Sequence, residues 1–146
     1  MLSRTRLMEA YRMQDQDFLI TTEFIKNGYK LNEFSQGLIN LENDINDLES
    51  TIESQDKNNI FVRKLMQEHD KKADIYNQAI EIYKYLKYER YKETLAMIKK
   101  LEQLTKDDLQ KMQVPLDLYN KLLDVLKENV DLLKYDLKHL ESQQHE

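Results

Sequence analysis

The sequence of 146 residues contains no cysteine, one proline and two glycines. The absence of cysteine excludes disulfide bonds, zinc sites built on thiolates and cysteine nucleophiles, and it fits a reducing compartment. So few turn-forming residues cannot support a fold with many tight turns. No stretch alternates apolar and polar residues between turn clusters, so strands are not predicted. These absences favour an all-α protein built from long helices, as coiled coils and helical bundles are.

Long apolar runs are also missing, because no segment approaches the roughly 20 apolar residues of a transmembrane helix. The first residues, MLSRTRLMEAYRM, carry Arg4, Arg6 and Arg12 against Glu9 alone, as a targeting or membrane-surface helix would. They lack the apolar core of a secretory signal and continue into a longer helical pattern. We therefore expect a plain helix here, an intracellular and cytoplasmic protein, and no membrane contact.

Charged residues make up 34% of the chain, yet the formal net charge is only −5. A negative chain argues against a general nucleic-acid binder, whose affinity depends on many phosphate contacts. Residues 31–60 hold seven acidic side chains and one basic, whereas residues 61–113 hold twelve basic and nine acidic. The acidic segment could therefore fold back on the basic one, with charge pairs that select the pairing direction.

The most regular pattern is LNEFSQGLINLENDINDLESTI, residues 31–52. Its apolar residues recur at steps of three and four, which places them in a narrow stripe on one side of a helix. Such a stripe needs a second helix to cover it, so we predict that it is a partner interface. The stripe consists of Leu31, Phe34, Leu38, Leu41, Ile45, Leu48 and Ile52.

Six polar residues, SQDKNN at 54–59, follow the stripe and favour a loop between two antiparallel helices over 29–55 and 59–113. The alternative is one very long helix, because the heptad continues through Val62, Met66 and His69. Earlier in the chain, Asn27-Gly28 predicts a break or kink after a helix over 4–27. One unbroken helix remains the alternative there as well, since Phe24 falls in the heptad register.

Two features divide the second half of the chain. The apolar face rotates near residues 87–91, which predicts a bend, a stutter or a short loop within the helix over 59–113. Thr105 followed by Asp108 resembles a helix N-cap, so a new helix begins there or the pattern sits on a continuing one. Val114-Pro115 is a firmer boundary, because proline disfavours helix at the residue before it. The last helix is therefore predicted over 115–142.

That last helix carries a second apolar stripe, which we also predict to be a partner interface. Leu118, Leu122, Val125 and Leu132 widen it beyond a two-stranded contact, which indicates packing against two neighbours. The stripe itself consists of Tyr119, Leu123, Leu126, Val130, Leu133, Leu137 and Leu140. Upstream, Tyr85, Tyr88 and Tyr91 lie among lysines and form a candidate secondary contact, although tyrosines at the edge of a helical core are the simpler interpretation.

Residues for chemistry are scarce, and we expect no enzyme, no cofactor and no metal site. The chain has three histidines, of which His145 lies in the tail. His139 follows Asp136 by three residues, but one such pair is too little for a metal site in a bundle. No glycine-rich phosphate loop and no nucleophile motif occurs.

Taken together, the sequence predicts one helical domain over 1–146, an antiparallel hairpin followed by a C-terminal amphipathic helix. The function expected is that of a non-catalytic coiled-coil adaptor subunit, which binds protein partners by helical packing in a homo- or hetero-oligomer. One alternative is a small helical-bundle chaperone or regulator that binds a partner's amphipathic helix. A second is a peripheral membrane protein that uses the basic N-terminal helix.

Overall fold

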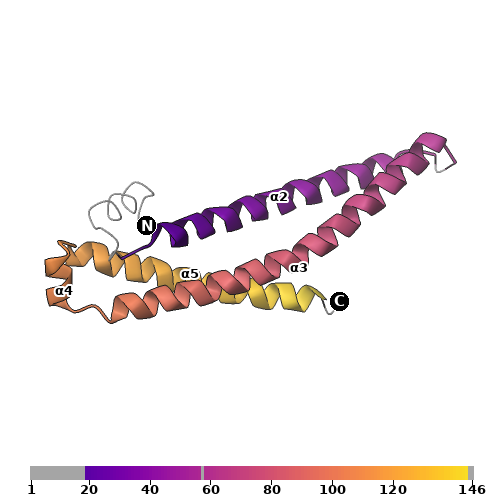
Figure 1. Ribbon diagram of the computed structural model, residues 1–146. Coiled ribbons are helices and arrows are strands. Elements are labelled where there is room, and N and C mark those ends of the chain that lie inside the picture. The colour runs from indigo at the N-terminus through magenta and orange to yellow at the C-terminus, as the bar shows by residue number, and fades with distance from the viewer. Residues whose placement is uncertain (1–18, 57, 145–146) are drawn as a thin grey trace. The chain divides into compact units, whose positions relative to one another are not determined.

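The computed structural model describes residues 19–56 and 58–144, and every regular element within them is an α-helix. The all-α class predicted from the sequence is confirmed. Among these residues no helix is long and apolar enough to cross a membrane. The helices are α2 (Thr22–Glu53), α3 (Ile60–Glu102), α4 (Lys106–Lys111) and α5 (Leu116–Gln144) (Figure 1).

The chain forms two compact units rather than one continuous set of contacts. Unit 2 is Lys30–Leu86, and unit 1 consists of Met1–Tyr29 together with Lys87–Glu146. Both α2 and α3 contribute residues to each unit. The apolar face of α3 rotates near residues 87–91 because α3 passes there from unit 2 into unit 1, where it packs against other residues. Helix α3 runs through these residues without a break, so a short loop there is wrong, whereas the bend and the stutter stay predictions.

Unit 2 is an antiparallel hairpin of α2 and α3, joined through residues 54–59 (Figure 1). This connection coincides with the polar run SQDKNN, and the alternative of one long helix through it is wrong. Contacts between the helices show that they are antiparallel, because residues later in α2 contact residues earlier in α3. They are Phe34 stacked on Tyr83 with ring centroids 6.0 Å apart, Asp44 with Lys72 at 3.6 Å, and Glu49 with His69 at 2.9 Å.

The predicted stripe of α2 lies on the inner side of this hairpin, where the ring of Phe34 stacks on Tyr83 of α3. Leu38 is buried and the other six residues of the stripe are half-buried. On α3, Val62 is fully buried at the connected end. Half-burial follows from the architecture, because one helix shields only one side of another.

Unit 1 holds the larger apolar core. It joins residues from before and within α2, from the last turns of α3, from α4 and from α5. Helix α5 meets more than one neighbour there, which is why its apolar stripe is wide. The buried members are Leu19, Ile20, Phe24, Met97, Ile98, Leu101, Leu109, Val114, Leu122, Leu126 and Val130.

The helix predicted over 4–27 is wrong at its described end. Residues 4–18 of it lie outside the described residues, and Leu19 and Ile20 are buried before the helix begins. Helix α2 begins at Thr22 because the Thr21 hydroxyl accepts a hydrogen bond from the backbone N–H of Phe24 at 3.1 Å, as an N-cap does. The break predicted at Asn27-Gly28 is also wrong, since α2 is continuous from Thr22 to Glu53.

The helix predicted over 59–113 ends earlier, at Glu102. Thr105 then caps the new helix α4, with its hydroxyl accepting from the Asp108 N–H at 3.1 Å and its own N–H donating to the Asp108 carboxylate at 2.9 Å. This reciprocal pair is a capping box, and it satisfies two backbone donors that a helix start leaves open. Of the two alternatives for Thr105, a new helix is therefore correct.

Helix α4 ends in a tight left-handed turn. Gln113 has a φ of 57°, a conformation that costs a residue with a Cβ more than it costs glycine. The Val114 N–H bonds the Leu109 carbonyl at 2.9 Å and the Gln113 N–H bonds the Gln110 carbonyl at 3.1 Å, which together form a Schellman motif. Pro115 follows, and α5 begins at Leu116, one residue after the predicted start.

Candidate interaction surfaces

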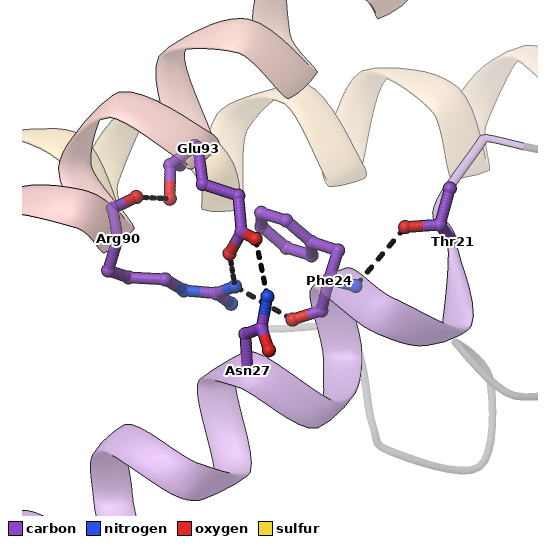
Figure 2. A network of polar contacts seen from close by, with 6 residues as sticks. Thr21, Phe24, Asn27, Arg90 and Glu93 are labelled. Atoms are coloured by element: carbon purple, nitrogen blue, oxygen red, sulfur yellow. Dashed lines mark hydrogen bonds and ion pairs between the residues drawn. The ribbon is translucent and has the colours of Figure 1, made fainter. Parts of the chain in front are cut away.

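A polar network in unit 1 explains why α2 is continuous through Asn27-Gly28 (Figure 2). The Arg90 guanidinium lies 3.7 Å from the centre of the Phe24 ring and donates to the Phe24 carbonyl at 2.7 Å. It also donates to Glu93 at 2.6 Å, and Glu93 accepts from the Asn27 amide at 2.7 Å. A Cβ on Gly28 would lie 2.7 Å from an Arg90 nitrogen. Asn27 and Gly28 therefore serve a contact between helices.

The charge of Arg90 also serves the contact between these helices. Burial lowers the pKa of Arg90, while the hydrogen bond that Arg90 donates to Glu93 raises it. The guanidinium nevertheless stays charged, because an arginine pKa lies far above neutrality. A half-buried charge with three close partners holds helices together and leaves little capacity to bind a ligand.

The tyrosine and lysine cluster of α3 divides into separate local contacts. Tyr85 and Tyr88 are exposed, whereas Tyr91 packs against the unit 1 core. Lys87 is buried and paired with Asp136 of α5. Lys87 and Arg90 both pair with groups of this chain, so these two cations are engaged in internal contacts rather than in binding nucleic-acid phosphates. The predicted secondary contact through Tyr85, Tyr88 and Tyr91 stays a prediction.

Internal packing takes up most of the predicted α5 interface. Leu126 and Val130 are buried in the unit 1 core, and Tyr119, whose hydroxyl donates to the Leu101 carbonyl at 2.7 Å, packs against it with Leu123. The remaining members, Leu133, Leu137 and Leu140, are half-buried. As a partner interface the stripe stays a prediction.

Other apolar side chains stay open to solvent. On α3 of unit 2, Ile75 and Ile82 are each 51% exposed, and on α2 Ile39 is 48% exposed. On α5, Leu132 and Tyr135 are also exposed, and Tyr135 stacks with His139. Sequence reasoning missed Ile39, Ile75 and Ile82 as surface residues because they fall beside the heptad stripes. The spacing of apolar residues does not show how much of a helix its neighbour shields from solvent.

A hollow of about 270 Å³ lies on unit 2 near the connected end of the hairpin. Its apolar lining comes from Ile52 and Met66, and its polar lining includes His69. The His69 ring contacts the Glu49 carboxylate at 2.9 Å and the Asp70 carboxylate at 3.2 Å. These hydrogen bonds, Glu49 first and Asp70 second, raise the pKa of His69 above its ordinary value of 6.5.

The other shifted groups in the part of the chain that the structure describes have local structural causes. Burial raises the pKa of Tyr76, with Glu42 adding to it, and the two Thr105 hydrogen bonds lower the pKa of Asp108. No group of three or more potential metal ligands is found among residues 19–56 and 58–144. The basic segment with Arg4, Arg6 and Arg12 lies outside the described residues.

Comparison with known proteins gives no relative, since no protein-family model, no curated protein and no solved structure matches this chain.

Proposed function

We propose that this protein is a non-catalytic helical adaptor that binds protein partners by packing helices against its hairpin, within an intracellular complex. The observation that carries the proposal is the incomplete cover of unit 2. Its described residues form a single layer of two helices, and each helix shields only the inner side of the other. Domains usually bury their apolar faces between two packed layers.

The exposed isoleucines of α3 are the strongest sign of a missing layer. Ile75 and Ile82 are one heptad apart and therefore lie on the same side of α3. Both are about half exposed, although isoleucine is among the residues most often buried. A helix from a partner chain laid along this side would cover both side chains at once. The partner is a second copy of the chain or a different protein.

The test compares two double variants of the full chain by light scattering coupled to size exclusion, and by affinity capture of partners. Ile75→Lys/Ile82→Lys adds charge to the exposed apolar side, and we expect it to lower the assembly mass or to lose the captured partner while helicity is kept. Asn77→Lys/Gln67→Lys adds the same charge at exposed polar positions of α3 and should change neither. A monomeric wild-type chain that captures no partner would contradict the adaptor function.

A further inference from the structure

The hollow on unit 2 interrupts the apolar stripe of the hairpin at one specific place. Val62, Met66 and His69 follow one another in the heptad register of α3. Val62 is fully buried, yet Met66, one turn later, is 43% exposed. Protein interiors leave few voids larger than a water molecule. Met66 shares the heptad register of the buried Val62 but lines the hollow, so the hollow is a gap that another side chain can fill.

The rim of the hollow has a strong negative charge. Glu49 and Glu53 come from α2 and Asp70 comes from α3. Among the described residues of the lining, only His69 can carry positive charge. The carboxylates remain accessible, because the side chains of Glu49 and Asp70 are 53% and 83% exposed even though both contact His69. A partner cation could therefore pair with the rim without breaking the hairpin.

The openness of the hollow distinguishes between two kinds of ligand. Pockets for small molecules usually hold about 300–1,000 Å³ and enclose most of the ligand. At about 270 Å³ this hollow lies near the lower end of that range, and because it is open to solvent it would not enclose a small molecule. It fits an anchoring side chain that projects from a larger partner surface, as hot-spot residues of protein interfaces do. Methionine in the lining favours this use, since its flexible side chain adapts to the shape of an incoming group.

We propose that the hollow binds a basic amphipathic helix of a protein partner, which inserts one apolar side chain between Ile52 and Met66 and places lysines or arginines against Glu53 and Asp70. This inference rests on the adaptor function and names the class of partner. The apolar floor requires an apolar anchor, and the acidic rim selects cations beside it. An amphipathic helix presents both on neighbouring turns, with anchors spaced by three or four residues.

The experiment measures fluorescence anisotropy of a labelled helical peptide of leucine and lysine, about 18 residues or five turns long, against the full chain. A scrambled peptide of the same composition reports binding through charge alone. Met66→Gln tests the apolar floor. Glu53→Gln/Asp70→Asn tests the rim and keeps the contact between Glu49 and His69. Glu33→Gln/Asp47→Asn removes the same charge from exposed positions of α2 outside the hollow.

We expect Met66→Gln and the rim variant each to weaken the amphipathic peptide about tenfold, and the control variant to change affinity by less than about twofold. The scrambled peptide should bind more weakly than the amphipathic one. Equal binding of the two peptides, equal effects of the rim and control variants, or no binding by the wild-type chain would each overturn the inference. The adaptor function is judged separately, because its test concerns Ile75 and Ile82 and uses assembly mass and captured partners.

Discussion

The two glycines of α2 should respond in opposite ways to the same substitution. Alanine stabilises a helix interior by about 1 kcal/mol relative to glycine. Gly37 has no atom within 4 Å of the position that a Cβ would take, so Gly37→Ala should gain this amount. Gly28 is different, because its Cβ would lie 2.7 Å from one Arg90 nitrogen and 3.3 Å from the guanidinium carbon.

Arg90 cannot yield at no cost, although its guanidinium is the end of a long side chain. It donates to the Phe24 carbonyl at 2.7 Å and lies 3.7 Å from the ring centre. A hydrogen bond to a charged group contributes about 1.5–3 kcal/mol. Losing the bond to Phe24 and gaining about 1 kcal/mol of helix propensity leaves Gly28→Ala less stable by about 0.5–2 kcal/mol.

A double-mutant cycle isolates the cause. Arg90→Met keeps an unbranched apolar side chain over Phe24 and removes the clash, so Gly28→Ala in that background should stabilise by about 1 kcal/mol, as Gly37→Ala does in the wild type. Urea unfolding followed by circular dichroism at the helical band gives the free energies. If Gly28→Ala and Gly37→Ala stabilise the wild-type chain equally, the assigned role of Gly28 is wrong.

Three further predictions concern the ends of α4 and the histidine of the hairpin. Gln113→Gly should raise the free energy of unfolding by about 1 kcal/mol, because φ at this position is 57°; a Gln113→Ala control should not. Thr105→Ala removes the capping box and should lower the free energy of unfolding by about 1 kcal/mol in the same urea assay, whereas Thr51→Ala, inside α2, should cost less. His69 has a raised pKa, so its contribution to stability is complete below its unfolded value of 6.5 and is lost as pH rises through the folded value. A urea series across this range should show that decline in the wild type and not in His69→Gln, and an unchanged decline in the variant would refute the assignment.

Local patterns predicted the parts of the fold that local forces determine. The polar run at 54–59 marked the connection of the hairpin, since six polar residues cannot continue an apolar stripe. Pro115 marked the start of α5 within one residue, because proline restricts the backbone on both sides. The stripe from Leu31 to Ile52 identified the inner side of α2 for the same reason, since its spacing depends on helix geometry alone.

Contacts between distant residues account for the main error. As a local pattern, Asn27-Gly28 predicts the end of a helix. Its partners Arg90 and Glu93 lie in α3, and Asn27 and Glu93 are 66 positions apart in the sequence. No local pattern reveals that a glycine makes room for a side chain so far along the chain. The sequence also placed the end of α3 too late, although Thr105 and Asp108 carried the cap that starts α4. The sequence contained this cap, but the same residues also fitted a helix that continues through them.

The candidate surfaces show the same division between local and distant causes. Heptad spacing identifies which residues face a neighbour, but it does not say how many neighbours there are. Leu126 and Val130 of α5 find theirs inside unit 1, so their spacing predicts packing without predicting a partner chain. Ile75, Ile82 and Met66 have no such cover within the described part of unit 2. The binding surface of a helical protein is therefore the apolar surface that remains exposed after internal packing. For this reason the proposals for this protein rest on Ile75 and Ile82, which lie beside the stripes, and on Met66, which lies in the heptad register but is exposed.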